Sequence, residues 1–430
     1  MKSRATRLAV LCVLALLAAP SSASAHAALL TATPGSGAVV GTAPRTLALA
    51  YDEDVVPQYA RVTVIGAHGQ ELAGTPHVSG STVTVPLRSA PKGSYTVRWR
   101  MVASDDGHAT EGAFSYGVRV KPQPPGPVSS LALPVAPELL AWLQFVGIVL
   151  TGGMLTFRAL VWTPATRGLE VVEREAPFTL WAAVVGGVLA LHAGLFAFLA
   201  GAYSIVGGGL SGFVNTEIEP IRVGTHLGQA WMVMTFAWLG VLGLLVAAWV
   251  YPRVRERLLA GAGVLALAIA FGLSWASHPA SRGTLALIAD YIHLLTGALW
   301  VGGLVVLVIA ARAVPSSTRE DVVRRCILQF SRLVAPTVAL VVSAGVYLAL
   351  RELPSPSALV ASGYGITLLI KAGVAVPALA LGGYHRRFVV PRLASGASIA
   401  IIRRTLMFEL GVLVTVLAVA AVLTQRAPPV

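Results

Sequence analysis

The N-terminal quarter of the chain alternates polar and apolar residues. From about residue 26 to 125 this period-two pattern recurs in five segments, at 46–51, 61–65, 82–87, 95–102 and 113–120. Such alternation is typical of strands with one buried face, and turns rich in glycine or proline separate the segments. Short strands at this spacing predict an all-β domain, either a Greek-key β-sandwich or a small barrel.

From about residue 139 the pattern changes to apolar runs of roughly 20 residues, the length that crosses the ~30 Å hydrocarbon core of a bilayer. These runs predict eight transmembrane helices, with cores at 137–157, 178–203, 228–250, 258–277, 285–310, 333–350, 364–385 and 405–424. An α-helical polytopic membrane domain therefore follows the β domain. An even number of spans returns the C-terminus to the side of the membrane that holds the β domain.

Composition and charge agree with this layout. The chain is 56% hydrophobic and 12% charged, which is too apolar for a protein that is soluble throughout. Its formal net charge is +13, and sixteen arginines fall on predicted cytoplasmic segments whereas four fall on the outer loops and the tail. The positive-inside rule accounts for this bias. The basic balance is therefore a topology signal, and we expect no nucleic-acid partner.

The first 25 residues have the organisation of a secretory signal peptide. A basic start with Lys2 and Arg4 precedes a short apolar stretch at 8–19, and the small residues at 23–25 form a cleavage site. Cleavage there makes His26 the mature N-terminus. A freed N-terminal histidine offers an amine and an imidazole, and divalent copper favours such nitrogen donors.

These features divide the chain into five parts. We predict a signal peptide at 1–25, a metal-binding β domain at 26–120, a proline-rich linker at 121–136, the membrane domain at 137–424 and a tail at 425–430. The two cysteines are Cys12, in the signal peptide, and Cys326, in a predicted cytoplasmic loop. The mature β domain has no cysteine, so we expect neither a disulfide nor a thiolate metal site in it.

A loop between two predicted strands supplies partners for His26. Asp106 and His108 flank Gly107, whose conformational freedom lets the two side chains converge. By itself such a triplet is more often a surface turn. Together with the amine and imidazole of His26, however, it offers three nitrogens and one carboxylate oxygen. That donor set suits planar Cu(II) better than tetrahedral zinc.

The membrane helices carry ionisable residues, which are costly in lipid and mark ion paths or paired polar sites. Asp290 and His293 are three residues apart on one helix face, and His278 ends the preceding helix on the same side. We take these three as the main candidate site for copper in the membrane. The wider candidate path adds His226, His192, Lys371 and His385. For His226 and His385 the alternative is a side chain at the membrane interface, and for His192 it is a hydrogen bond between helices. We expect Lys371 to pair with Asp290 or Glu409, or to act as a gate.

Several segments of the chain resemble known families. HAALLTATPGSG at 26–37, LAYDEDV at 49–55, WRMVASDDGH at 99–108 and GAFSYGV at 112–118 resemble the CopC family of periplasmic copper-binding proteins. SHPA at 277–280, DYIHLLTGALWVGG at 290–303, FSRL at 330–333 and YGITLLIK at 364–371 resemble the CopD family. The chain is thus similar to a CopC–CopD fusion over nearly its whole mature length.

The resemblance implies a cupredoxin-like or immunoglobulin-like β domain in which His26, Asp106 and His108 bind Cu(II). Glu53 matches an acidic position near that site and is expected to support the ligands without binding the metal. One branch of the family has a methionine-rich loop for cuprous ion. This chain has no methionine between His26 and Arg100, which argues against a soft copper site in the β domain.

The predicted function is copper transport. The outer domain would capture Cu(II) and the helices of a bacterial cytoplasmic membrane would pass copper inward, with the β domain and the C-terminus outside. Resistance by extracytoplasmic sequestration or by export is an alternative, as is a redox protein with histidine-bound haem. No ATP-binding motif is visible, and an enzyme is not expected because Asp106 would fill the in-plane position that a substrate needs. The expected partners are copper and the lipid bilayer.

Overall fold

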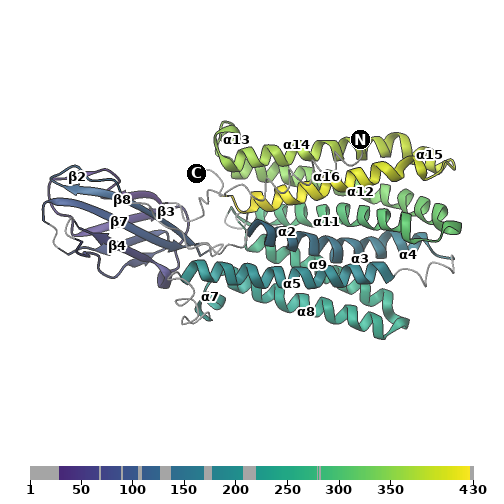
Figure 1. Ribbon diagram of the computed structural model, residues 1–430, viewed down its shortest axis with the longest axis horizontal. Helices are drawn as coiled ribbons and strands as arrows, with labels where there is room; N and C mark the ends of the chain where they lie inside the picture. The colour runs from purple at the N-terminus through teal and green to yellow at the C-terminus, as the bar shows by residue number, and fades with distance from the viewer. Residues whose placement is uncertain are drawn as a thin grey trace. The chain divides into compact units, whose positions relative to one another are not determined.

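The computed structural model describes residues 29–66, 69–88, 91–104, 109–125, 137–168, 177–206, 219–277, 279 and 282–426. The chain forms two compact units, one built around β-strands and the other around long helices (Figure 1). Four residues predicted to bind copper lie outside the described residues: His26, Asp106, His108 and His278.

The β unit is a sandwich of two four-stranded sheets, with orders β1-β3-β6-β5 and β2-β8-β7-β4. The strands are β1 (Leu29–Thr33), β2 (Val39–Val40), β3 (Thr46–Tyr51), β4 (Arg61–Ile65), β5 (His77–Ser79), β6 (Thr82–Pro86), β7 (Gly93–Val102) and β8 (Ala109–Val118). Alternate residues such as Leu47 and Leu49 of β3 and Val97 of β7 are fully buried in one core. The period-two pattern therefore supplies the inner faces of both sheets.

The five strands predicted from the alternation are confirmed, with differences of a few residues at some of their ends. Of the two predicted architectures, the structure has the sandwich, because its strands form two separate sheets. Three further strands, β1, β2 and β5, are five, two and three residues long. β2 and β5 hold too few alternating positions to stand out in the sequence, whereas β1 is as long as β4 and β6 but its apolar residues Leu29 and Leu30 are adjacent and break the alternation.

Among the described residues, eight helical segments are long and apolar enough to cross a membrane, as predicted. The first joins α2 (Pro137–Ile148), α3 (Met154–Phe157) and α4 (Thr163–Ala165) through π-helical turns at Val149–Gly153 and Arg158–Trp162. The others are α5 (Pro177–Val206), α8 (His226–Val250), α9 (Arg255–Trp275), α11 (Thr284–Ala313), α12 (Ser316–Glu352), α14 (Gly363–Tyr384) and α16 (Ala400–Thr424). A π-helical turn at His385–Val389 extends α14 into α15 (Val390–Ala394), and α7 (Glu219–Gly224) and α13 (Ala358–Ala361) are short connecting helices.

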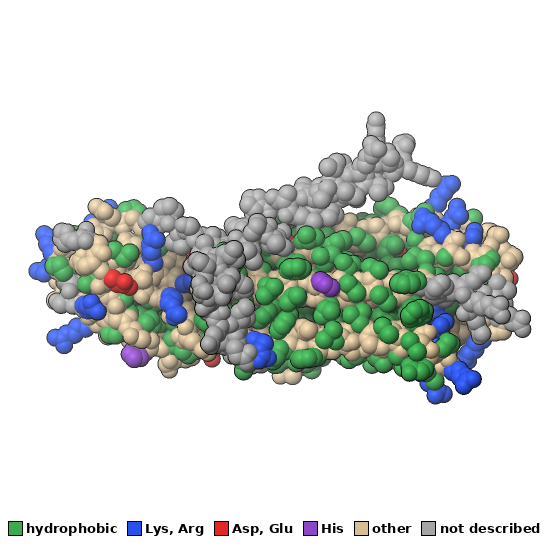
Figure 2. All heavy atoms as spheres, turned by 60° about the horizontal axis from the view of Figure 1, so that its bottom comes forward, with side chains coloured by type: hydrophobic (Ala, Val, Ile, Leu, Met, Phe, Trp, Pro, Cys, Tyr) green, Lys and Arg blue, Asp and Glu red, His purple; other side chains and the backbone are tan. Residues whose placement is uncertain are grey.

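The outer surface of the long helices is apolar, as expected of a surface that faces lipid. Figure 2 shows hydrophobic side chains along their length and Lys and Arg side chains gathered at one end. That end is formed where α8, α11 and α14 end and where α9, α12 and α16 begin. Its exposed arginines are Arg253, Arg257, Arg312, Arg325, Arg332, Arg386, Arg387, Arg392, Arg403 and Arg404. We call it the Arg-rich end, and the opposite end the Arg-poor end.

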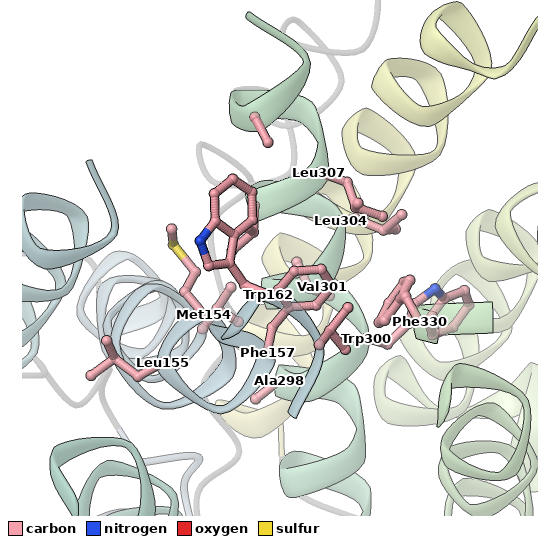
Figure 3. Close-up of a cluster of buried hydrophobic side chains, with 14 of the residues drawn as sticks. Met154, Leu155, Phe157, Trp162, Ala298, Trp300, Val301, Leu304, Leu307 and Phe330 are labelled. Carbon is pink, nitrogen blue, oxygen red and sulfur yellow. The ribbon is translucent and has the colours of Figure 1, made fainter. Parts of the chain in front are cut away.

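The buried core of the helices centres on α11 and the first membrane-spanning segment. Figure 3 shows Trp300, Val301 and Leu304 of α11 near Met154 and Phe157, with Phe330 of α12 close to Trp300. The two backbones meet at glycines, because a Cβ added at Gly302 would lie 2.5 Å from the carbonyl carbon of Gly153. Small residues allow such close approach between membrane helices.

The structure corrects two details of the predicted layout. Helix α12 begins at Ser316, so Cys326 is not in a loop but is fully buried on a helix. Arg158, predicted on a cytoplasmic segment, lies within the first span and is 7% exposed. Its guanidinium donates to Glu256 at 2.7 Å and to the Thr179 hydroxyl at 3.0 Å, and these partners compensate for burying a charge.

Candidate functional site

The partly buried imidazole of His293 has a defined tautomer. Its Nδ1 lies 2.8 Å from the carbonyl oxygen of Val341 on α12. Because a carbonyl only accepts, Nδ1 carries the proton and the lone pair is on Nε2. A hydrogen bond of this kind is what orients a metal-binding histidine. His293 therefore presents Nε2 as a ready ligand atom.

Lys371 occupies the position in front of that ligand atom. Its Nζ lies 3.4 Å from Nε2 of His293 and can donate a hydrogen bond to it. The two residues come from α14 and α11, which are 78 residues apart in sequence at this point. An ammonium group on the Nε2 lone pair excludes a metal ion there, so Lys371 must move before His293 can bind copper.

Asp290 lies one helical turn before His293, as the spacing predicts. The Ser277 hydroxyl, beyond the end of α9, is 3.4 Å from Oδ2 of Asp290. The Asp290 carboxylate also interacts electrostatically with Lys371 and with Tyr364 of α14. Of the two carboxylates suggested for Lys371, Asp290 is thus the one that acts on it.

An ion pair between a partly exposed arginine and a buried carboxylate lies near Asp290 at the Arg-poor end of the helices. Nε of Arg282 is 3.5 Å from Oε2 of Glu352, whose side chain is 2% exposed. Both charges act on Tyr364, as Asp290 does. The polar cluster of Asp290, His293 and Lys371 therefore continues toward this end through charged residues, as expected of an ion path.

His385 is placed differently from the other candidates. It follows α14 and is 6% exposed, and its Nδ1 lies 3.2 Å from Oε2 of Glu409. Its Nε2 lies 2.8 Å from the Thr405 hydroxyl. Both ring nitrogens have protein partners, as those of His293 do, but neither partner is a cation that copper would displace, so we do not carry His385 into the copper site proposed below. Glu409 is the partner of His385 and of the Trp300 indole, at 3.3 Å, which leaves Asp290 as the carboxylate for Lys371.

The remaining membrane histidines do not join this cluster in the described structure. His192 is exposed on α5, and its Nδ1 lies 2.8 Å from the Val188 carbonyl of the same helix. His226 begins α8, and its side chain is outside the described part, as is His278. Within the described residues, no three His, Cys, Asp or Glu side chains are grouped closely enough to hold a metal ion.

The backbone of the β unit brings the segments that lead to His26, Asp106 and His108 together. Leu29, which starts β1, pairs with Tyr51, the residue that precedes 52–54. Val102 and Ala109 pair, which makes 103–108 the loop of the β7–β8 hairpin. A Val55–Ala103 bridge joins the root of that loop to the same segment.

Glu53 lies on the segment that these pairings connect. The amide of Ser104 donates to the carbonyl of Asp54 at 2.8 Å, which fixes the segment against the start of the loop. Below it, Tyr51 is 2% exposed and its ring meets Trp99 edge to face at 5.4 Å. Burial raises the pKa of the Tyr51 phenol far above its usual range, so the phenol stays neutral and is not a competing anionic ligand.

Both units match known families. Residues 29–119 match the CopC domain, and residues 324–423 match copper resistance protein D, CopD. The copper transport protein CutJ of Bacillus subtilis is 24% identical over 440 residues, covering 98% of this chain and 77% of CutJ. Protein YobA of Escherichia coli K12 is 31% identical over 100 residues, covering 22% of this chain and 80% of YobA. This chain combines a CopC domain with a CopD domain.

The two matches divide between the two units. The CopC match contains all eight described strands, and the CopD match contains most of α12 together with α14 and most of α16, including Lys371, His385 and Glu409. Asp290 and His293 precede the CopD match but lie within the wide alignment with CutJ. The solved CopC structure from Methylosinus trichosporium OB3b is 24% identical and covers 24% of this chain and 100% of its own, with a TM-score of 0.21.

Proposed function

We propose that this CopC–CopD protein is a membrane copper transporter that takes up Cu(II) outside the cytoplasm and passes copper inward. The observation that carries the proposal is the His293–Lys371 contact beside Asp290 inside the apolar helices. It combines an oriented imidazole, a carboxylate and a displaceable cation. Relatives named for copper transport and copper resistance support copper as the cargo.

In the first step, the CopC domain binds Cu(II) through the amine and imidazole of His26 together with Asp106 and His108. The donor set of three nitrogens and one carboxylate oxygen suits divalent copper. The pairing of Leu29 with Tyr51 and of Val102 with Ala109 supports the convergence of these ligands. Glu53 assists by hydrogen bonding to the ligands, and the β domain acts by binding, not by catalysis.

In the second step, copper reaches the CopD helices from the Arg-poor end, where Asp290 attracts the cation. Copper then displaces Lys371 and binds Nε2 of His293. Because the ammonium group covers Nε2 until a metal competes for it, the site is closed in the absence of copper. His278, one residue after Ser277, is the third ligand that we propose for this site, and His226 lies at the entrance.

The same proposal fixes the sidedness of the protein. The Arg-rich end lies in the bacterial cytoplasm, since arginine-rich loops stay on the inner side of the membrane. The β domain and the C-terminus then lie outside, and copper moves from the Arg-poor end to the Arg-rich end.

The test compares cellular copper in cells that lack the protein with cells that make the wild type, H293Q or D290N. Import predicts more cytoplasmic copper with the wild type and a return toward the level of protein-free cells with both variants. H77Q is the matched control, because His77 is an exposed histidine of β5 that no step of the proposal uses, and it should behave as the wild type. Unchanged cytoplasmic copper would refute transport, and a reduced level would assign the protein to export.

A further inference from the structure

The copper path does not use the second buried ionisable pair of the helices, His385 and Glu409. These side chains are 8% and 3% exposed and join the turn after α14 to α16. Trp300 of α11 donates its indole N–H to Oε1 of Glu409 at 3.3 Å, and Thr405 contacts the other side of the imidazole. Ionisable groups buried this deeply in a membrane protein mark a functional site by default.

The hydrogen bonds of this cluster indicate how many protons it holds. The Thr405 hydroxyl lies 2.8 Å from the carbonyl oxygen of Ile402, which can only accept, so the hydroxyl proton points there. Nε2 of His385 must then carry its own proton and donate it to Thr405. Between Nδ1 and Oε2 of Glu409, 3.2 Å apart, one more proton is required, because two lone pairs would otherwise face each other.

The pair therefore holds one removable proton in the conformation described. With that proton the pair is neutral overall, either as imidazolium with carboxylate or as imidazole with carboxylic acid. Without that proton the pair has one net negative charge, and the Trp300 N–H still donates to Glu409. Burying such a charge is costly, so loss of the proton must accompany a change in conformation or the arrival of a cation.

The charged groups on the surrounding helices do not neutralise the pair. On α11 the next cation is Arg312, which contacts the sulfur of Met407. Arg386, next to His385, donates to the Ser331 carbonyl of α12 at 2.8 Å. On α16, Arg403 and Arg404 are exposed. Each of these arginines is exposed or engaged elsewhere, which leaves the proton itself to balance Glu409.

A route for the proton leads to the Arg-rich end. Thr405 lines a surface groove of about 400 Å³ between α14 and α16, in which Tyr384 and Arg404 are the other polar residues and apolar side chains such as Leu381 and Phe408 form the rest. It is the sixth residue of α16, close to the end of the helix at which the arginines gather. The Thr405 hydroxyl thus stands between the groove and Nε2 of His385, where it can pass a proton between them.

The proton pair and the copper cluster share two helices. His293 and Trp300 are seven residues apart on α11, and Lys371 and His385 are fourteen residues apart at α14, so each pair lies on one face of its helix. A movement of α14 that withdraws Lys371 from His293 also moves His385 relative to Glu409. Copper binding and proton release thus involve the same helix.

We propose that His385 and Glu409 form a proton-binding site that exchanges with the Arg-rich side through Thr405 and couples copper movement to proton movement. The coupling half rests on the proposed transport function, whereas the proton site stands on its own hydrogen bonds. The cargo of the site is a single proton, carried between Nδ1 and Oε2, and no redox step is involved.

The test uses the full chain in proteoliposomes that contain a copper chelator and a pH-sensitive dye. For one proton per copper, a gradient of one pH unit should change the steady-state copper ratio of the wild type about tenfold, in opposite senses when the gradient is reversed. E409Q keeps an acceptor for Trp300 but cannot titrate, so its copper flux should not respond to the gradient. E409D should restore a response, and H77Q, at an exposed histidine of β5 that no step of the proposal uses, should keep that of the wild type.

A response retained by E409Q would overturn the coupling, as would wild-type copper flux that ignores the gradient. If the wild type moves no copper under any gradient, the transport function fails instead, and the proton site is judged by infrared spectroscopy of the full chain. A carboxyl band that changes with pH in the wild type and is missing in E409Q supports the site. Identical pH-difference spectra for the two proteins would refute it.

Discussion

Replacing Lys371 by methionine should open the copper site in the helices. Methionine keeps most of the length and apolar stem of lysine but has no charge and no donor for Nε2 of His293, 3.4 Å away. The Nδ1 hydrogen bond to Val341 is untouched, so the imidazole keeps its orientation. Copper then meets a free lone pair where the wild type presents an ammonium group.

The size of the effect follows from what copper must displace. A hydrogen bond from a charged donor contributes about 1.5–3 kcal/mol, and this cost disappears in K371M. That corresponds to a gain in copper affinity of roughly 10- to 150-fold. Repulsion between copper and an ammonium held within about 4 Å would add up to ~4 kcal/mol at an effective dielectric constant near 20. Loss of the cation beside Asp290 favours copper as well, because the metal then neutralises that carboxylate.

The affinity is measured by competition with a chromophoric copper chelator, in a full chain whose β-domain site is disabled by H26A. K371R keeps the positive charge and should stay close to the wild type. H293A in the K371M background should abolish the gain, since the gain is made at Nε2. If K371M binds copper as weakly as the wild type, or if the gain survives H293A, then Lys371 does not guard His293.

Four further predictions concern the rest of the molecule. Sequencing of the mature protein should begin at His26, and H26A or a blocked amine should weaken Cu(II) binding by the β domain at least about 100-fold, because even residues behind a ligand affect affinity 10- to 100-fold. Burial raises the pKa of Tyr51 in the folded state, so the contribution of the neutral phenol to folding stability is complete below the unfolded-state pKa of ~10 and is lost as pH rises from there toward the folded-state pKa. Alkaline unfolding followed by tyrosinate absorbance should therefore shift to higher pH in Y51F, and an unchanged profile would contradict this. G302A should lower thermal stability by about 1–3 kcal/mol through overpacking against Gly153, whereas G194A, which meets no atom within 4 Å, should not. The purified protein should show no Soret band, and a strong one would favour the haem alternative.

The sequence predicted the fold where its signal was long and periodic. The eight membrane spans and the five strands with regular alternation have a period that can be recognised. The sequence did not predict the first part of α12, because arginines and acidic residues make residues 316–332 polar and their mean hydropathy is too low for a membrane span. Val322, Cys326 and Phe330 are nevertheless buried at helical spacing, a pattern that a search for amphipathic periodicity could have found.

The candidate site was predictable only within single helices. The spacing of Asp290 and His293 places them on one face, but nothing local shows that Val341 accepts from Nδ1 of His293 or that Lys371 meets Nε2. Trp300 and Glu409 meet across 109 residues of sequence. Such pairings depend on how helices pack, which the pattern of one helix does not contain.

The glycine contact between Gly153 and Gly302 makes one part of the helical unit tightly packed, in contrast to α14. No side chain lies between the two backbones, so α11, which carries His293, packs directly against the first span. Helix α14 is largely exposed and contains Pro377, which lies between Lys371 and His385 and weakens the helix at that point. A bend at Pro377 would swing the two ends of α14 in opposite senses. The protein would then open toward one face of the membrane as it closes toward the other.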